Sequence, residues 1–412
     1  MRIRLMSIVC LGAFLFSCKG NKQEADFVVN GFARAEQQLS AQLSELPEPT
    51  GYPRTIDRNG NLRVTHKNDW TEGFYPGCLW YMYEYEDDKK WKDAAVKWTE
   101  ALESLKTQTN HHDIGFLMYC SFGNGYRLTG NEAYKEILLE SARSLCTRFN
   151  EKIGCIESWN YRKAWNGKDE WFYPVIIDNM MNLELLYFAS KVTGDSIYAR
   201  IANKHAETTA LNHFRKDYST YHVVNYDETT GRVLHQATCQ GFSDNSTWAR
   251  GQAWAIYGYT MAYRETQRHD FLNMAIHAAD FWLNHPNLPE DGVPYWDFNA
   301  GQDGYVPDWN YDPQAFKIIP RDASAAAIAA SAFLELADYV DDGGKYEQAA
   351  EHILKSLSSP AYLAEPGTNC NFVLMHSVGS IPHSSEIDVP LVYADYYYLE
   401  ALLRYNNRKN KR

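Results

Sequence analysis

The body of this 412-residue chain contains no run of lysine or arginine, and its acidic residues outnumber its basic residues by 52 to 40. The resulting formal net charge of −12 argues against nucleic-acid binding, which depends on a basic surface. An anionic substrate would therefore need a locally positive pocket within this acidic protein.

The cysteines form none of the patterns that bind metal. Eight are present, but they include no CxxC pair and no zinc-like Cys/His spacing. We therefore expect no structural metal. Four of the six cysteines beyond residue 18 sit in apolar or aromatic segments, which is typical of small core residues.

Long apolar segments are also missing, apart from residues 5–16, which are too few to span a bilayer as a stable helix. Basic residues precede this segment, and Leu15-Phe16-Ser17-Cys18 ends it in a pattern that resembles a bacterial lipobox. We expect residues 1–18 to be a lipoprotein signal peptide, Cys18 to be acylated, and residues 19–25 to be a tether. An exported protein, anchored by lipid in the cell envelope on the periplasmic side or at the cell surface, would follow. A plain secretory signal or a buried helix is the alternative.

Aromatic residues are abundant, with 12 Trp, 29 Tyr and 18 Phe in the chain. Core packing accounts for most of them. Aromatic rings also stack on the flat faces of sugars while their polar edges form hydrogen bonds, so this composition suits a carbohydrate site.

Helical periodicity extends through nearly the whole body of the chain. Apolar residues recur at spacings of three and four in about twelve segments. We predict helices at 25–45, 72–87, 89–106, 114–128, 131–149, 178–192, 195–213, 247–265, 268–285, 321–340, 343–358 and 388–405.

Several neighbouring segments share a joint in which Gly ends one helix and Asn or Asp caps the next, as at Gly130-Asn131 and Gly194-Asp195. The joints are unevenly spaced, which excludes a solenoid of fixed period. We expect an all-α ring of about six helical hairpins, with long loops at one end. No Pro/Ser-rich linker divides residues 26–408, so we expect a single domain there.

Two acidic clusters lie where helices are expected to begin. Trp70 stands between the carboxylates of Asp69 and Glu72, which suits either a sugar platform or a helix cap. Asp113 follows two histidines in His111-His112-Asp113. It is either a cap or a functional acid, and metal binding is disfavoured because adjacent side chains diverge on a helix.

Asp178 is the more unusual acid, because Ile176-Ile177-Asp178-Asn179-Met180 places it within an apolar run. Burial raises the pKa of a carboxyl group and lets it donate a proton near neutral pH. Helix capping is the alternative role.

A dense polar and aromatic stretch follows later in the chain. Arg250 lies between Trp248 and Trp254 at the start of a predicted helix, and could form a bidentate clamp for a carboxylate. The two rings could stack against sugars, or Arg250 could simply pack on them. Other candidates for substrate contact are His222, Gln240, and the hydroxyls of the loop at 376–388, Ser377 and Ser380.

Four motifs together resemble the unsaturated glucuronyl hydrolases of glycoside hydrolase family 88: HHDIGF, IDNMMNL, SDNSTWARGQAW and EIDVPLVYADYYYLEALLR. The resemblance runs from about residue 66 to 405. It implies an (α/α)6 barrel and a substrate with a 4,5-unsaturated uronic acid at its non-reducing end. It assigns the general acid and base to Asp178, an assisting role to Asp113, and substrate contacts to Trp70, His222, Gln240, Trp248, Arg250 and Trp254.

The implied reaction is hydration of the C4=C5 double bond without metal or organic cofactor. Asp178 would protonate C4, water would add at C5, and the resulting hemiketal would open and release the neighbouring sugar. Some relatives use a lysine near the two serines of the final loop to bind sulfate. Pro382 follows Ser380 here and no lysine lies in 376–388, which puts a preference for substrates sulfated at that position in doubt.

Three other functions are compatible with parts of the pattern. Unsaturated rhamnogalacturonyl hydrolases, which act on pectin fragments, share two of the motifs. A sugar 2-epimerase would need histidine pairs in late loops. A non-catalytic glycan-binding lipoprotein would have little need for buried acids such as Asp113 and Asp178.

Overall fold

The computed structural model describes residues 26–66, 68–164, 167 and 169–411. The expected signal peptide, Cys18 and the tether lie outside these described residues. None of the helices within them has both the length and the apolar character that crossing a membrane requires.

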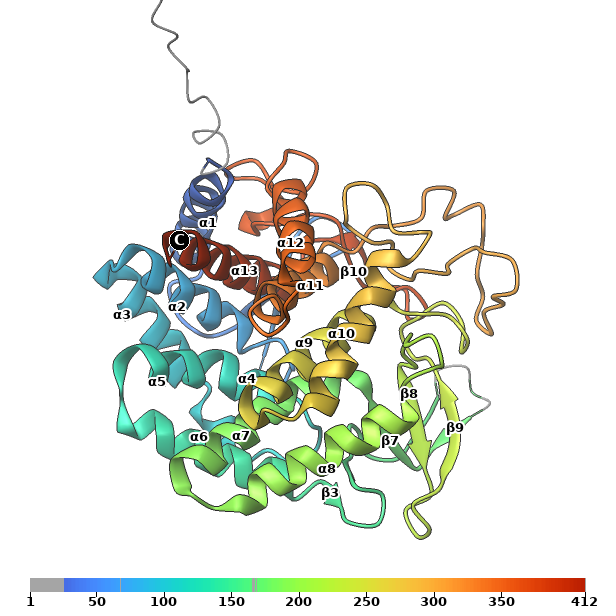
Figure 1. Cartoon of the computed structure of the whole chain (residues 1–412). Helices are drawn as coiled ribbons and strands as arrows, with labels where there is room; N and C mark the ends of the chain where they lie inside the picture. The colour runs from blue at the N-terminus through green and yellow to red at the C-terminus, as the bar shows by residue number, and fades with distance from the viewer. Residues whose placement is uncertain (1–25, 67, 165–166, 168, 412) are drawn as a thin grey trace, which may run out of the picture.

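Within the described part of the chain, six inner helical segments surround the centre of the barrel, and Figure 1 shows how they are arranged. Several are apolar on every side, as expected of helices surrounded by protein. In α9, for example, every residue from Ala249 to Tyr263 is buried. The inner segments are α2 (Phe74–Glu86), α4–η2–α5 (Ile114–Met118, Tyr119–Gly123, Asn124–Thr129), η3–α7 (Ile177–Asn182, Leu183–Thr193), α9 (Ala249–Thr266), α11 (Ala323–Leu336) and α13 (Val392–Lys411).

An outer set of helices packs on the inner set through one apolar stripe each. In α12 the buried side chains include Tyr346, Ala350, Ile353 and Leu357, at helical spacing. The outer helices are α1 (Asp26–Glu45), α3 (Lys89–Glu100), α6 (Glu132–Cys146), α8 (Ser196–Asn212), α10 (His269–Asn284) and α12 (Gly343–Leu357), with the short η1 (Glu103–Thr107) after α3.

The predicted joints between helices are confirmed. Asn131 and Asp195 accept hydrogen bonds from backbone N–H groups two residues later and cap α6 and α8. Gly130 and Gly194 end α5 and α7 with φ of 66° and 74°, the left-handed region that favours glycine.

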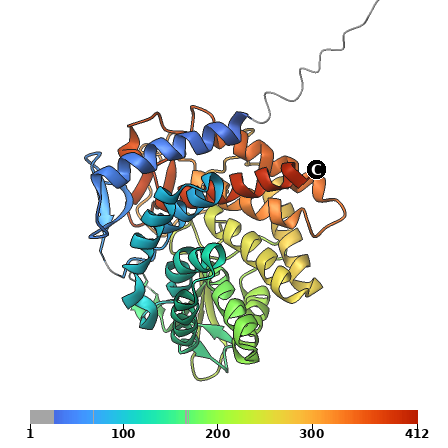
Figure 2. The same ribbon diagram turned by 90° about the vertical axis from the view of Figure 1, so that its left-hand side faces the viewer.

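The ring closes where the first helix meets the last. The chain passes round the barrel from blue through green and yellow to red, and α1 lies beside α13 (Figure 2). α13 also packs against α2 and α11. The predicted (α/α)6 barrel is confirmed, and the twelve predicted segments coincide with its helices.

Short strands, which periodicity did not predict, occupy the connections that lead from outer to inner helices. They pair as two-stranded sheets, β1 with β2, β3 with β4, β5 with β6 and β10 with β11. The strands β7, β8 and β9 form a three-stranded antiparallel sheet in that order. Their bounds are β1 (Tyr52–Ile56), β2 (Leu62–Thr65), β3 (Phe149–Asn150), β4 (Cys155–Ile156), β5 (Arg162–Lys163), β6 (Glu170–Trp171), β7 (Tyr173–Ile176), β8 (Val223–Tyr226), β9 (Val233–Ala237), β10 (Ser377–Ser380) and β11 (Ser385–Val389), with η4 (Asn369–Asn371) before β10.

These connections all lie at the end of the barrel where the inner helices begin. Strands two to five residues long carry too few residues to show alternation reliably. They fix the loops that the sequence predicted at one end, and thereby surround the N-termini of the inner helices with ordered side chains.

Candidate active site

A cavity of about 330 Å³ opens at the loop end of the barrel. Side chains from the predicted motifs and from the sheets meet in it. The lining residues are Arg54, Trp70, Asp113, Trp159, Arg162, Ile176, Asp178, Cys239, Gln240, Arg250, Gly379, Ser380, His383, Ser385, Glu386 and Tyr393. Six of the ten residues predicted to form the site therefore face one cavity.

Asp178 lies in the first turn of η3, directly after β7. Its residue is 8% exposed, and its Oδ2 has no hydrogen-bond partner among the described residues. Burial raises the pKa of Asp178 to about 7, although Arg250 and the indole of Trp254 act in the opposite direction. The carboxyl group can thus give and take a proton near neutral pH, as its apolar surroundings in the sequence predicted.

Asp113 lies between the two histidines that precede it in sequence. His112 Nε2 is 3.3 Å from Asp113 Oδ1, and His111 Nδ1 is 3.4 Å from Oδ2. Burial alone would raise the pKa of Asp113, but His112 and His111 outweigh it and hold the pKa below its ordinary value. The side chain does not cap α4. Asp113 is therefore a half-buried carboxylate held by two histidines, and its side chain does not cap the helix.

His222 precedes β8 and faces the same acid. Its Nδ1 accepts hydrogen bonds from the backbone N–H groups of Cys239 and Gln240, at 3.0 and 3.1 Å. Because Nδ1 is an acceptor, the imidazole proton sits on Nε2, which lies 3.7 Å from Asp178 Oδ2. Burial, reinforced by Arg250, lowers the pKa of His222 well below its usual range, so the ring is a neutral donor aimed at Asp178.

Arg250 differs from the free clamp that its position suggested. Its Nη1 is 2.9 Å from Asp322 Oδ2, its Nη2 donates to the carbonyl of Gly379 at 2.8 Å, and Nη1 also donates to the carbonyl of Val378. The guanidinium is fully buried over the ring of Trp248, at 4.6 Å. Much of its charge is already neutralised by Asp322, the N-cap of α11.

Three other predicted contacts need correction. Trp248 and Trp254 are 2% and 0% exposed, and the Ser377 residue is 0% exposed, so none of them lines the cavity. Trp248 supports the imidazole of His222, with ring centroids 4.5 Å apart. Trp254 packs between Phe116 and Tyr397. These tryptophans lie behind the cavity wall, where they cannot stack on a sugar directly.

Trp70, Gln240 and Ser380 do face the cavity. Trp70 is held by Phe74, Phe116 and Tyr393, with ring centroids 4.9 to 5.7 Å away. Gln240 Nε2 donates to the carbonyl of Gly379 at 3.1 Å. The amide of Gln240 is thereby tied to β10, opposite the acids.

The sequence motifs did not reveal several residues of the wall. Arg54 of β1 bonds Glu386 of β11 through Nη2 at 2.9 Å and also pairs with Asp69. Trp159 and Arg162 come from the long connection between α6 and η3. No local pattern distinguished them, because their place in the site depends on the pairing of β5 with β6.

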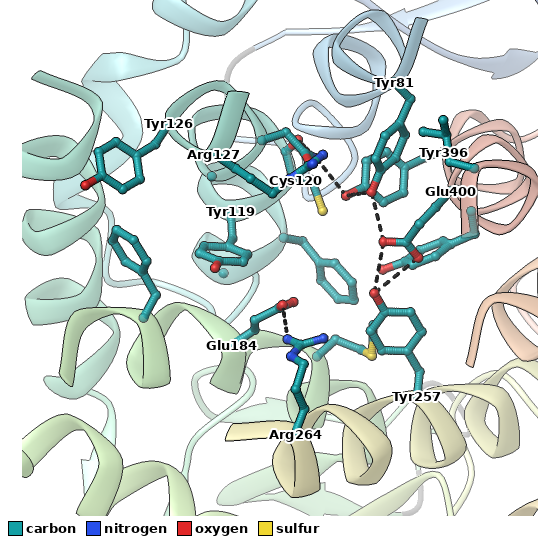
Figure 3. A pocket seen from close by; sticks show the side chains of 18 of the residues that line it. Tyr81, Tyr119, Cys120, Tyr126, Arg127, Glu184, Tyr257, Arg264, Tyr396 and Glu400 are labelled. Atoms are coloured by element: carbon teal, nitrogen blue, oxygen red, sulfur yellow. Dashed lines mark hydrogen bonds and ion pairs between the residues drawn. The ribbon is translucent and has the colours of Figure 1, made fainter. Parts of the chain in front are cut away.

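A larger cavity of about 560 Å³ lies at the opposite end, where the inner helices finish (Figure 3). Its central carboxylate, Glu400, accepts hydrogen bonds from Tyr81 at 2.8 Å and Tyr257 at 3.0 Å. Glu184 of α7 pairs with Arg264 of the neighbouring α9, beside it in the cavity wall. Each of these acids has partners, whereas Asp178 presents an unpaired oxygen. The smaller cavity is therefore the better candidate for proton-transfer chemistry.

The described residues contain no group of three His, Cys, Asp or Glu side chains that could hold a metal ion. His111 and His112 are instead engaged by Asp113, and His222 by the backbone of 239–240.

Residues 52–279 match the model of Glycosyl Hydrolase Family 88. The chain is 45% identical to an unsaturated glucuronyl hydrolase of Formosa agariphila, over 94% of this chain and 93% of the relative.

Solved structures give the same result. The chain resembles an unsaturated glucuronyl hydrolase specific for heparin, with a TM-score of 0.86, 46% identity, and coverage of 93% of this chain and 98% of the other. It also resembles a mutant unsaturated glucuronyl hydrolase of Streptococcus agalactiae complexed with dGlcA-GalNAc6S, with a TM-score of 0.75, 32% identity and 92% coverage of each chain.

Proposed function

The chain belongs to glycoside hydrolase family 88, and from this membership we propose how it hydrolyses oligosaccharides that end in an unsaturated uronic acid. The reaction is hydration of the C4=C5 bond, and Asp178 is its general acid and base. Products of glycosaminoglycan lyases are the substrate class, because relatives of this chain include an unsaturated chondroitin disaccharide hydrolase and an unsaturated glucuronyl hydrolase specific for heparin.

The main support for this assignment is the burial and the raised pKa of the Asp178 carboxyl group. A buried carboxyl with a pKa of about 7 and an unpaired Oδ2 is protonated in part of the molecules at neutral pH. It can deliver its proton to C4 of the bound uronate while positive charge develops at C5. The carboxylate that remains then accepts a proton from the water that adds to C5.

The remaining steps need no further proton donor from the protein. The hydrated C5 is a hemiketal, which opens to a ketone and leaves C1 as a hemiacetal that releases the neighbouring sugar. The glycosidic bond breaks as a consequence of hydration, unlike the direct displacement at C1 in ordinary glycosidases.

His222 and Asp113 prepare Asp178 for this cycle. The Nε2–H of His222 faces Asp178 Oδ2 at 3.7 Å and can stabilise the carboxylate once its proton has left. The negative charge of Asp113 contributes to the raised pKa of Asp178 and so favours its protonated state. The two acids have pKa values shifted in opposite directions, which is the usual division of labour between paired carboxyl groups.

An absorbance assay tests the proposal. Unsaturated disaccharides absorb ultraviolet light through the C4=C5 double bond, and hydration removes this absorbance. We expect the purified protein to consume unsaturated glycosaminoglycan disaccharides faster than an unsaturated pectic disaccharide. Turnover of the pectic substrate alone would favour the rhamnogalacturonyl reaction, and binding without any loss of absorbance would indicate a glycan-binding protein.

A further inference from the structure

The cavity at the far end of the barrel, where the inner helices finish, takes no part in the proposed reaction. Its volume of about 560 Å³ lies within the range of about 300–1,000 Å³ that is typical of small-molecule pockets. Exposed residues from the ends of three inner helices, Arg127, Lys191 and Asn407, line it near the surface. The buried Gly115 and Phe116 line its inner part. The cavity therefore leads from the protein surface into the barrel.

The charged side chains that line this cavity neutralise one another. Each of the arginines has a carboxylate partner: Arg127 pairs with Glu84, Arg264 with Glu184 and Arg404 with Glu400. The carboxylate of Glu400 also accepts hydrogen bonds from the hydroxyls of Tyr81 and Tyr257. Lys191 lines the cavity too, but it is exposed to solvent. Within the described residues, the wall therefore has no buried charge left to attract an ionic ligand.

Two tyrosine hydroxyls of the wall remain without partners. Tyr397 of α13 is 2% exposed, and its hydroxyl forms no hydrogen bond with any described residue. The same is true of the hydroxyl of Tyr119, in η2. Burial raises the pKa of both tyrosines, so both hydroxyls stay protonated. Because an unpaired buried hydroxyl costs free energy, a ligand that enters the cavity gains by pairing with them.

Aromatic rings cover much of the remaining wall. Phe188 lies between Tyr119 and Tyr126, with ring centroids 5.7 and 5.6 Å away. The wall also contains a π-helical turn, η2, a rare element that often occurs at functional sites. This turn brings Tyr119 and Cys120 to the cavity (Figure 3). The wall thus combines flat apolar faces with unpaired hydroxyls.

We propose that this cavity is a second ligand site and that it binds a neutral sugar. Aromatic faces suit the apolar faces of a pyranose ring, and the hydroxyls of Tyr119 and Tyr397 suit its polar edge. Arg264 bonds Oε1 of Glu184, which leaves Oε2 to accept a hydrogen bond from a sugar hydroxyl. The inference does not depend on the reaction proposed above.

Other classes of ligand fit this wall less well. An ion would lose its hydration and meet arginines and carboxylates that already neutralise each other. A wholly apolar molecule would leave the hydroxyls of Tyr119 and Tyr397 buried without partners. A neutral molecule with several hydroxyls avoids both costs.

The test measures Kd on the full chain by ligand-observed NMR titration. The neutral probes are D-glucose, D-galactose and N-acetyl-D-galactosamine, and the charged probes are D-glucuronate and D-glucosamine. We expect a neutral probe to bind more tightly than either charged one. Tyr397→Phe and Tyr119→Phe keep the ring and remove the hydroxyl, so each should raise the Kd of that probe by about threefold to tenfold.

Tyr75→Phe is the matched control. The hydroxyl of Tyr75 is also buried without a partner among the described residues, but it does not line the cavity. This variant should leave Kd unchanged, and Tm values identify any variant that fails to fold.

The possible outcomes bear on this site and not on the reaction. No binding of any neutral probe would contradict the inference, and so would binding that neither Tyr397→Phe nor Tyr119→Phe weakens, because the sugar would then lie elsewhere. Tighter binding of D-glucuronate or D-glucosamine would contradict the choice of a neutral ligand. Activity on unsaturated disaccharides is measured separately, and its absence would count against the proposed function alone.

Discussion

Asp178 is buried and Asp113 half-buried in the same cavity wall, yet their surroundings shift their pKa values in opposite directions. Asp178 is in an apolar wall with a neutral histidine beside it, whereas Asp113 is flanked by His111 and His112. The surroundings of Asp178 favour its protonated form, and those of Asp113 favour its ionised form. Location on neighbouring inner helices brings these two environments to one cavity.

The raised pKa of Asp178 predicts a pH profile. The reaction needs the protonated acid, so kcat/KM should hold its value at lower pH and fall by about tenfold per pH unit above pH 7, the value given for the Asp178 pKa. The pKa of His222 is lowered well below its ordinary value, so titration of His222 should not contribute to the fall in kcat/KM above pH 7. Initial rates between pH 5 and 9 provide the check, and a profile that stays flat to about pH 9 would contradict the assignment.

The same shift has a consequence for stability. The folded-state pKa of Asp178 lies above the ordinary value of 3.8, so the native state binds the proton more tightly than the unfolded chain does. Ionisation of Asp178 therefore costs stability as pH rises from about 4 to about 7. The asparagine of the Asp178→Asn variant cannot ionise, so the variant escapes this loss. The Tm of the variant minus the Tm of wild type should therefore increase as pH rises from about 4 to about 7. A Tm difference that is the same at about pH 4 and about pH 7 would show that folding does not raise the pKa of Asp178.

At the scale of helices and strands, Arg250 connects three elements, α9, the N-cap of α11 and β10. Arg250→Met leaves the buried carboxylate of Asp322 without its partner, which should cost about 3–5 kcal/mol of unfolding free energy. Adding Asp322→Asn should recover part of this loss, because Asn retains the capping geometry. Urea unfolding of the single and double variants measures the coupling. If Arg250→Met is as stable as wild type and shows only a higher KM, then Arg250 acts mainly as the clamp for a substrate carboxylate that its sequence position suggested.

Gly115 controls how closely α4 approaches the turn that carries Asp178. A Cβ at Gly115 would lie 2.4 to 2.6 Å from atoms of Asn182, which belongs to η3. We expect Gly115→Ala to displace η3, to cost about 1–3 kcal/mol of stability and to lower kcat more than it raises KM. Gly344→Ala in α12 is the control, because a Cβ there meets nothing within 4 Å. Identical behaviour of the two variants would show that η3 is not positioned by this contact.

The helices were predictable because their signals are local. Apolar spacing and the Gly-Asn and Gly-Asp joints lie within a few residues of one another, and so does the apolar run around Asp178. The partners of Arg250 could not be predicted, because Asp322 is 72 residues away in sequence. The same holds for Arg54 with Glu386 and for the place of Arg162 in the cavity wall, which depend on how loops meet across the barrel.

For the whole molecule, the barrel places the acids of its inner helices at one end and surrounds them with ordered loops. The N-termini of those helices face the cavity, and their partial positive charge favours an anionic ligand despite the net charge of −12. The motifs predicted the fold and the acids. They did not predict which aromatic rings face the cavity, because a helix sequence does not fix which side meets the barrel axis.

Export and anchoring remain a prediction from residues outside the described part of the chain. We propose that Cys18 is acylated and becomes the N-terminus of the mature protein when the residues before it are removed. Cys18→Ser should then release the protein from the membrane fraction without changing its kcat, and fractionation with immunoblotting measures this. A wild-type protein recovered entirely from the cytoplasm would contradict both the lipobox and the export route.

The central claim is that Asp178 delivers the proton to C4, and Asp178→Asn tests it most directly. The substitution keeps the shape of the side chain and removes only the titrating proton. Wild type and variant should be compared for loss of C4=C5 absorbance on one unsaturated disaccharide, with circular dichroism to confirm that both are folded. We predict that turnover falls on the order of a thousandfold or more. A folded variant that retains a tenth of wild-type activity would show that another group is the general acid.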